Sequence, residues 1–225
     1  MLLIKIGKRE HLELLQKGYI HFNHLSLFRA DGTAYRGDAL EGTCRVDASR
    51  GLYINGVDIS KIGAGLEVTY TYQHSDDVLI FCAAVLDESN TIVTEKDGKQ
   101  YRELTPIFLE ELKKFGSHAV MFQSSHLIKS VSSYLNTRNC NYGYCKVEYV
   151  DKQDFEAVSA YFQKKHKQLG DEAIFFLKDF SYKNQNEWRF LIECFDGIST
   201  VDKNPNGSLD VKVTPFPTSD IIELV

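Results

Sequence analysis

A continuous apolar run, Val78-Leu-Ile-Phe-Cys-Ala-Ala-Val85, limits the folds open to this chain more than any other stretch. The run has the length of a strand and lacks the polar alternation of a strand that faces water, so we expect it to be buried on both faces. It is therefore predicted to lie at the centre of a sheet. Ile80 and Ala84 are accordingly expected to be shielded from solvent.

Strand and helix signals are mixed along the rest of the chain. Apolar and alternating patterns predict strands at residues 2–6, 19–22, 66–72, 117–122, 146–150, 188–194, 209–213 and 221–225. Capping and periodicity predict helices at residues 10–17, 106–115, 125–136 and 154–169. Asn55-Gly56 and Asp97-Gly98 indicate tight hairpin turns. This mixture predicts an α+β fold: a single domain over residues 1–225, with a mixed, antiparallel-rich sheet and several packed helices.

Composition is that of an ordinary globular protein. The chain has 225 residues, of which 43% are hydrophobic, enough for one sizeable core. The net charge of -5 argues against a general polyanion-binding surface, although it is compatible with a local basic groove. No apolar run approaches membrane-spanning length. The apolar stretch at residues 1–6 is too short for a signal peptide and is interrupted by a charged residue too early. We therefore expect a cytoplasmic protein that does not associate with a membrane.

The five cysteines are Cys44, Cys82, Cys140, Cys145 and Cys194. Their number is odd, and the chain is long enough to fold without disulfides, so we expect reduced thiols. Cys140 and Cys145 lack the two-residue spacing of a zinc knuckle, and no paired His or Cys cluster elsewhere would complete a tetrahedral site. A structural metal is therefore not expected.

The strongest lead to function is the stretch from Phe180 to Glu193. Here a polar loop runs straight into an apolar strand, and Gln185 and Glu187 stand two residues apart at the junction. Alternate residues of an extended chain point the same way, so a carboxylate and an amide would lie together at the lip of a sheet. This pattern is typical of a side chain aimed into a cleft. The alternative is an ion pair between Glu187 and a nearby Arg or Lys, with Trp188 in the core.

Other candidate ligand-binding residues lie near predicted strand ends, where side chains commonly face a pocket. His21, His24 and Arg29 lie near the end of the strand predicted at 19–22; for His21 the alternative is a partly buried, hydrogen-bonded histidine. Ser124 and Ser125 lie between a predicted strand and the predicted helix that follows it. Their hydroxyls are therefore expected to cap the helix, with ligand binding as the alternative.

A glycine-rich segment over residues 28–42 alternates Arg with acidic side chains. Arg36, Asp38 and Glu41 are candidates for a fixed polar wall, because guanidinium binds carboxylate or phosphate in a planar, bidentate way. A solvated turn with internal ion pairs is the alternative. No phosphate-binding loop motif is present, so nucleoside-triphosphate enzymes of the common types are disfavoured.

Three segments together resemble a bacterial family of domains of unknown function, whose motifs are Arg-Gly-Asp-x-x-Glu-Gly and Gln-x-Glu-Trp-Arg. Members often lie near mobile elements or abortive-infection genes, so the resemblance implies a role in phage defence or a toxin system. The segments are 15–28, 36–42 and 176–189, and the late motif is matched by Lys178, Tyr182, Gln185, Glu187, Trp188 and Arg189.

A second resemblance is to ADP-ribosyltransferases, in which Gln-x-Glu enters a late strand as Gln185-Asn-Glu187 does here. It implies an ADP-ribosyltransferase-like fold and NAD as substrate, with Glu187 stabilising an oxocarbenium-like transition state. It also implies that Gln185 and His21 assist catalysis. The NAD-binding residues it implies are Arg29, Arg36, Ser124 and Tyr182.

Three functions follow from these observations, and the sequence leaves them open. One is an NAD-dependent ADP-ribosyltransferase or NAD-hydrolysing effector, with a protein or nucleic acid as acceptor. The second is a noncatalytic protein that binds a nucleotide or nucleic acid. The third is a component that contacts a partner protein of a defence system.

Overall fold

The structure is a computed structural model that describes residues 1–30, 33, 38, 40–47, 53–54, 57–58, 67–72, 78–138, 140–193 and 204–224. Contacts divide the chain into two compact units. The first unit consists of Met1–His24, Asp77–Lys146 and Asn184–Val225, and the second of Leu25–Asp76 and Val147–Lys183. Each unit therefore joins segments that are far apart in sequence. A single domain over residues 1–225 stays a prediction.

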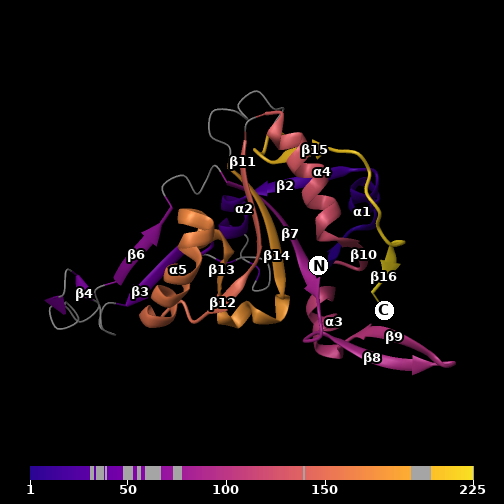
Figure 1. The fold of residues 1–225 in the computed structure, drawn as a ribbon, viewed down its shortest axis with the longest axis horizontal. Helices are drawn as coiled ribbons and strands as arrows, with labels where there is room; N and C mark the ends of the chain where they lie inside the picture. Colours follow the sequence, from indigo (N-terminus) through magenta and orange to yellow (C-terminus); the bar gives the residue numbers. More distant parts are fainter. Residues whose placement is uncertain are drawn as a thin grey trace. The chain divides into compact units, whose positions relative to one another are not determined.

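The first unit is built on one large antiparallel sheet (Figure 1). Its strand order is β11-β14-β7-β1-β10-β16, and β2 pairs with both β7 and β15. The strands are β1 (Leu2–Gly7), β2 (Tyr19–His24), β7 (Val78–Leu86), β10 (His118–Gln123), β11 (Asn141–Lys146), β14 (Glu187–Glu193), β15 (Leu209–Lys212) and β16 (Ile222–Glu223).

The central position predicted for the apolar run is confirmed. One edge of β7 pairs with β14, and the other edge is shared by β1 and β2. Ile80 and Ala84 are only 2% and 7% exposed. A strand paired on both edges and covered on both faces favours apolar side chains, since a polar side chain there would need a buried partner, which accounts for the unbroken apolar run.

Helices cover both faces of this sheet. Helices α1 (Arg9–Gln16) and α4 (Ser124–Asn136) contribute to the larger core, with Leu12 and Leu15 from α1 and Leu127 and Val131 from α4. Helix α3 (Pro106–Lys113) packs Phe108 and Leu112 into a second, smaller core that includes Ile4 of β1. A large antiparallel sheet with packed helices confirms the predicted α+β class. The ADP-ribosyltransferase-like arrangement stays a prediction.

Local signals placed two of the helix starts correctly. The Thr105 hydroxyl accepts a hydrogen bond from the Phe108 amide, and Pro106 begins α3. The Asp154 carboxylate accepts hydrogen bonds from two amides of the first turn of α5 (Phe155–Leu169). The predicted serine cap of α4 is wrong. Gln123 precedes the helix without a side-chain cap, and the Ser124 amide instead donates to the Met1 carbonyl at 2.9 Å.

The hairpin predicted at Asp97-Gly98 is confirmed. Strands β8 (Thr91–Lys96) and β9 (Lys99–Leu104) pair as a separate two-stranded sheet. Asp97 and Gly98 both have positive φ, 54° and 69°, as a primed turn requires. Most side chains of β9 are exposed.

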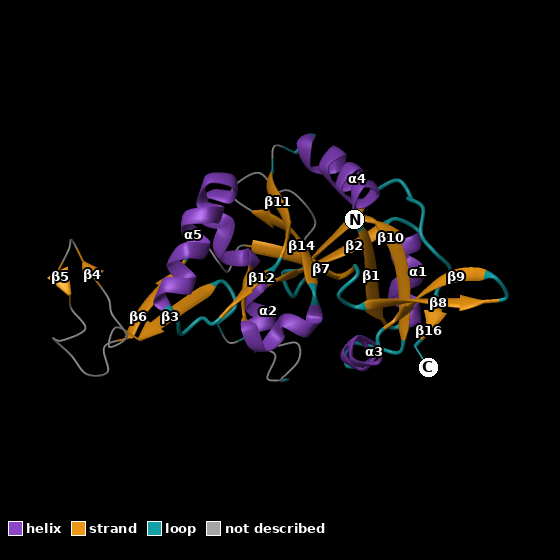
Figure 2. Ribbon diagram, turned by 60° about the horizontal axis from the view of Figure 1, so that its bottom comes forward, coloured by secondary structure: helices purple, strands orange, loops and turns teal. Residues whose placement is uncertain are grey.

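The second unit has small sheets beside helices, as Figure 2 shows. Strand β3 pairs antiparallel with β6, β4 with β5, and β12 runs parallel to β13. The Asn55-Gly56 turn lies outside the described residues, although the strands on either side of it pair. The elements are α2 (Leu25–Ala30), β3 (Thr43–Asp47), β4 (Tyr53–Ile54), β5 (Val57–Asp58), β6 (Glu67–Thr71), β12 (Glu148–Val150), α5, η3 (Gly170–Phe176), β13 (Leu177–Asp179) and η4 (Phe180–Gln185), which runs on into the first unit.

A separate hydrophobic core supports the second unit. It contains Cys44, Val158, Tyr161, Ala173 and Leu177, and the Tyr161 hydroxyl donates to the Ala173 carbonyl at 2.7 Å. The four described cysteines are free thiols, and Cys194 lies outside the described residues. Within the described ranges, none of the helices combines the length and the apolar character needed to cross a membrane.

Removing a core aromatic ring of β2 tests the packing of the large sheet. Phe22 is fully buried, with its ring centroid 6.0 Å from those of Phe81 and Phe190. We expect Phe22→Ala to lower the free energy of unfolding by about 3–5 kcal/mol, measured by urea denaturation. Tyr101→Ala, on the exposed β9, is the control and should change it by less than about 0.5 kcal/mol. Equal effects would contradict the packing described.

Candidate functional site

The junction between Gln185 and Glu187 is anchored to the end of the central strand. Asn186, between them, has a positive φ of 45°. Its carbonyl accepts from the Val85 amide at 2.8 Å, and its side-chain amide donates to the Val85 carbonyl at 2.9 Å and to Asp87 at 3.1 Å. Asn and Asp tolerate this backbone region better than other residues with a Cβ. Asn186 therefore fixes where β14 begins, and with it where Glu187 lies.

Asp87 is the acceptor that completes this anchor. Burial by itself would raise its pKa, but hydrogen bonds from Ser89, Lys146 and Asn186 outweigh burial and hold the pKa well below its usual range. Its bond to the Lys146 ammonium group is 2.9 Å long. The charged carboxylate is thus the form that the folded protein favours.

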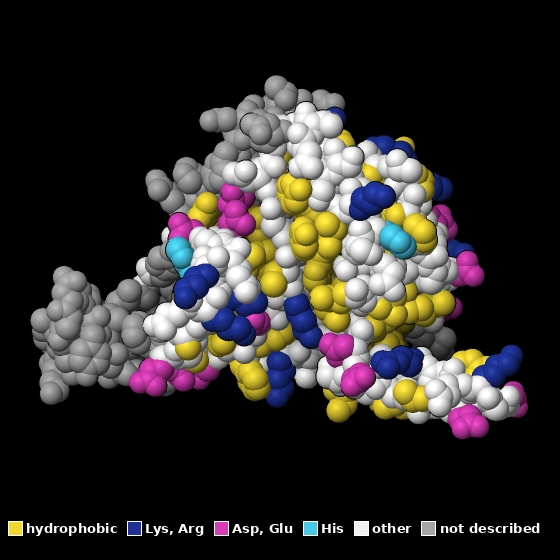
Figure 3. Space-filling view, viewed as in Figure 1, with side chains coloured by type: hydrophobic (Ala, Val, Ile, Leu, Met, Phe, Trp, Pro, Cys, Tyr) yellow, Lys and Arg dark blue, Asp and Glu magenta, His cyan; other side chains and the backbone are white. Residues whose placement is uncertain are grey.

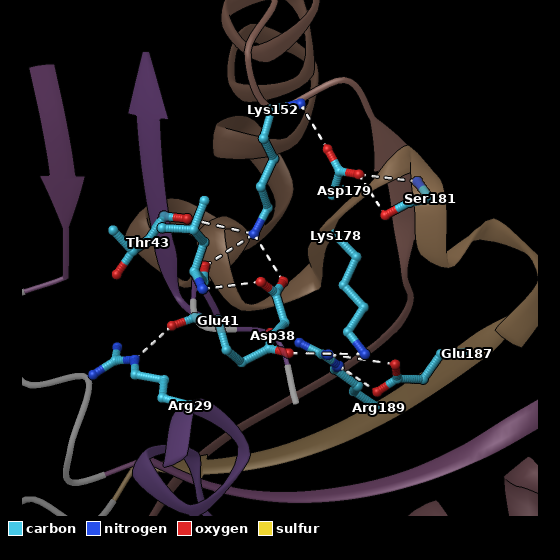
Figure 4. A network of polar contacts seen from close by, with 11 residues as sticks. Arg29, Asp38, Glu41, Thr43, Lys152, Lys178, Asp179, Ser181, Glu187 and Arg189 are labelled. Atoms are coloured by element: carbon cyan, nitrogen blue, oxygen red, sulfur yellow. Dashed lines mark hydrogen bonds and ion pairs between the residues drawn. The ribbon is translucent and has the colours of Figure 1, made fainter. Parts of the chain in front are cut away.

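The Glu187 carboxylate is buried and ion-paired. Glu187 is 7% exposed and Arg189 2%. The Arg189 Nε donates to Oε1 at 2.6 Å and Nη2 donates to Oε2 at 3.4 Å, as Figure 4 shows from close by. The ion pair that the alternative interpretation predicted is therefore present, and it lies within β14 itself.

Alternation along β14 separates two kinds of side chain. Trp188, Phe190 and Ile192 belong to the larger core, which confirms the predicted burial of Trp188. Glu187 and Arg189 consequently project from the opposite face of the sheet. On that face Arg189 is paired across the strands with Cys82. Burial, followed by the nearby Glu187 charge, raises the pKa of the Cys82 thiol, so this thiol is not a ready nucleophile.

His21 is engaged elsewhere on the sheet. Its Nδ1 lies 2.7 Å from an Asp210 carboxylate oxygen, its Nε2 lies 2.9 Å from the Asn23 side-chain oxygen, and the ring is half-exposed. Strand β2 meets β7 only at Asn23 and His24, whereas Glu187 pairs with Ala84. The structure records no hydrogen bond or ion pair between His21 and Glu187.

Ser124 also lies away from the junction. It follows β10, which is separated from β14 by β1 and β7. Three strand spacings amount to roughly 14 Å. Of the residues predicted for catalysis or NAD binding, the first unit thus brings together only Gln185 and Glu187, which are neighbours in sequence.

Arg29 and Tyr182 lie in the second unit, close to a buried acidic residue. The Arg29 Nε donates to the Glu41 carbonyl at 2.7 Å. The Glu41 carboxylate is 3.8 Å from the Lys178 ammonium group, which lies 5.2 Å from the centre of the Tyr182 ring. Burial, followed by nearby carboxylates, raises the pKa of the Tyr182 phenol. Arg36 lies outside the described residues.

A buried lysine that the sequence analysis missed organises the acidic turn of the second unit. Lys152 is 2% exposed, and its ammonium group donates to Asp38 at 3.2 Å, to the Leu40 carbonyl at 2.9 Å and to the Thr43 carbonyl at 3.4 Å (Figure 4). Asp38 in turn accepts from the Leu40 amide at 2.9 Å. Lys152 therefore binds both the carboxylate and the backbone of this turn.

The acidic segment is consequently not a solvated turn where it is described. Asp38 and Glu41 are 5% and 1% exposed, and each is paired with a lysine more than a hundred residues away in sequence. The only local signal for Lys152 is its position just before the Asp154 cap, which says nothing of its partner. Among the described residues, no group of three or more His, Cys, Asp or Glu side chains is placed to hold a metal ion.

Comparison with protein-family models, with curated proteins and with solved structures found no match to this chain. Both family resemblances therefore remain predictions from short motifs.

Replacing Lys152 tests whether the acidic turn depends on it. Lys152→Met keeps much of the side-chain volume but leaves Asp38 buried without its cation, so we expect unfolding free energy to fall by about 3–5 kcal/mol. Lys164→Met is the control, because that side chain is 68% exposed and should matter by less than about 1 kcal/mol. Urea denaturation measures both. A loss for Lys152→Met no larger than the control's would contradict the dependence of the acidic turn on Lys152.

The anchor at Asp87 predicts a pH dependence. A carboxyl whose pKa is lower in the folded state stabilises the protein above its unfolded value of about 3.9, and this stabilisation is lost as pH falls through the folded pKa. Asp87→Asn should therefore melt at a lower temperature than the parent protein at pH 7, and the difference should shrink as the solution is acidified below about pH 4. Circular dichroism measures the melting. Glu88→Gln, at the exposed neighbouring position, should show no such convergence.

Proposed function

We propose that this protein consumes NAD, as an ADP-ribosyltransferase or an NAD-hydrolysing effector, with Glu187 as the residue that stabilises the transition state. The observation that supports the proposal is the position of Glu187. Together with Gln185 it stands at the start of a buried strand, on a junction anchored by Asn186. An anchored backbone is what a catalytic carboxylate needs in order to act without reorganisation.

The proposed reaction breaks the bond between the nicotinamide nitrogen and C1′ of the ribose. The electron pair of that bond leaves with nicotinamide, and the ribose passes through an oxocarbenium-like state before water or an acceptor nucleophile attacks. A carboxylate beside the ribose stabilises charge that exists mainly in the transition state, so it accelerates the step instead of merely tightening binding. The Gln185 amide is suited to hydrogen-bond a ribose hydroxyl.

Arg189 has two opposed effects in this proposal. Its guanidinium fixes the orientation of the Glu187 carboxylate through bonds to both oxygens, which favours preorganisation. It also offsets part of the negative charge that would face the oxocarbenium-like state.

The proposal assigns catalytic roles to Glu187 and Gln185 and no step to His21 or Ser124. The acceptor class, protein or nucleic acid, and a role in phage defence or a toxin system belong to the same proposal.

Glu187→Gln tests the catalytic role. The substitution keeps the side-chain size but removes the charge, so nicotinamide release from NAD should fall on the order of a hundredfold or more. Release is followed by chromatography in the presence of candidate acceptors, and melting temperature is measured alongside. Glu193→Gln is a matched control, since Glu193 lies on the same strand, faces the same side and is 4% exposed.

The ion-pair alternative predicts a different pattern. If Glu187 serves only to neutralise buried Arg189, Glu187→Gln lowers stability and the parent protein releases no nicotinamide. No release and no NAD binding by the parent protein would contradict the enzymatic proposal. It would favour the noncatalytic nucleotide-binding or partner-contacting functions.

A further inference from the structure

Edge strand β11 presents two tyrosines and a lysine on one face of the large sheet. Tyr142, Tyr144 and Lys146 are alternate residues, so their side chains point the same way. They are paired across the strands with Ile192, Phe190 and Trp188, in that order. Because those three β14 residues belong to the larger core, this face is opposite the one that carries Glu187.

The tyrosine rings rest on buried aromatic rings. Tyr142 and Tyr144 both stack on Phe190, with centroids 5.6 and 5.8 Å away and interplanar angles of 18° and 28°. Tyr144 also lies 6.4 Å from the Trp188 ring. We call Tyr142, Tyr144, Phe190 and Trp188 the aromatic platform. Figure 3 shows hydrophobic side chains reaching the surface over the part of the first unit where β11 and α4 lie.

The rings of the aromatic platform that belong to β14 are buried, whereas the Tyr144 ring is exposed to solvent. Phe190 and Trp188 are 0% and 2% exposed, whereas Tyr144 is 43% exposed. The Tyr142 hydroxyl donates to the Asn136 side chain at 3.2 Å, which restrains that ring as well. A ring already held in place loses little conformational freedom when a ligand stacks on it. Tyr144 thus offers a prepared π-surface to solvent.

A lysine lies at one end of the platform, and an arginine follows the helix that holds its other end. Lys146 follows Tyr144 on the same face, and its side chain is 40% exposed while it pairs with Asp87. Arg138 comes two residues after Asn136, the hydrogen-bond partner of Tyr142, and its exposed guanidinium lies 3.7 Å from the centre of the Tyr134 ring and donates to the Tyr134 carbonyl and the Thr137 hydroxyl. Aromatic rings with cations beyond them match the chemistry of a nucleic-acid strand, which offers planar bases and phosphates.

We propose that the aromatic platform binds single-stranded nucleic acid, with a base stacked on Tyr144 and phosphates near Lys146 and Arg138. The exposed rings are too few for a stable protein interface, which needs about 800 Å² on each partner, but they suit one or two bases. The net charge of -5 makes the attraction local, so binding is salt-dependent and not a property of the whole surface. This site is separate from the proposed NAD reaction and does not depend on it.

The test is a titration with fluorescently labelled oligothymidine, followed by anisotropy. Trp188 is the chain's single tryptophan and lies beside Tyr144, so its emission reports stacking independently. We expect binding that weakens as salt is raised from about 50 to 200 mM, with a change in Trp188 emission on saturation. Duplex DNA hides the faces of its bases and should compete poorly. Thymidine monophosphate, with one base and one phosphate, should bind more weakly than the strand.

Tyr144→Ala should weaken strand binding about 5- to 150-fold, the range typical of one lost stacking contact. Tyr101→Ala removes a tyrosine of matched exposure, 44%, from β9 and should leave binding unchanged. Tyr144→Phe keeps the ring and should bind like the parent protein, which separates loss of stacking from loss of folding. No binding by the parent protein, equal losses in the two alanine variants, equal competition by duplex, or equal affinity for the mononucleotide would each overturn the proposal.

Discussion

Burial of β7 on both faces and both edges is the constraint on which the first unit depends. An apolar strand can sit at the centre of a sheet only if neighbouring strands satisfy its backbone on each edge and side chains cover each face. Strand β14 meets the first need on one edge, and β1 and β2 share the other. Because Asn186 hydrogen-bonds Val85 at the end of β7, this central strand also decides where the candidate carboxylate lies.

Each of the two units contains a buried ion pair. Glu187 with Arg189 in one, and Asp38 with Lys152 in the other, are ion pairs at positions almost closed to solvent. Such pairs must offset a large desolvation cost, and apolar residues of similar volume often stabilise a fold as well or better. Stability alone is therefore a weak account of these charges.

The two faces of β14 offer different chemistries. Side chains at odd-numbered positions, Glu187 and Arg189, project from one face, and those at even-numbered positions, Trp188 and Phe190, project from the other. Strand β11 extends the aromatic face to the sheet edge through Tyr144. One seven-residue strand thus supports both a polar cluster and an aromatic platform, since alternation keeps the two groups apart.

The sequence by itself determined the features that depend on near neighbours. These are the central apolar strand, the Thr105 and Asp154 caps and the Asp97-Gly98 turn, because periodicity, capping and positive φ are set within a few residues. Only the tertiary structure decided the rest. Lys152 meets Asp38 across 114 positions, and the Ser124 amide finds the Met1 carbonyl instead of a serine cap. Residues so far apart in sequence are brought together by the order of the strands in the sheet and by the path of the connecting segments. No short stretch of sequence specifies either of these.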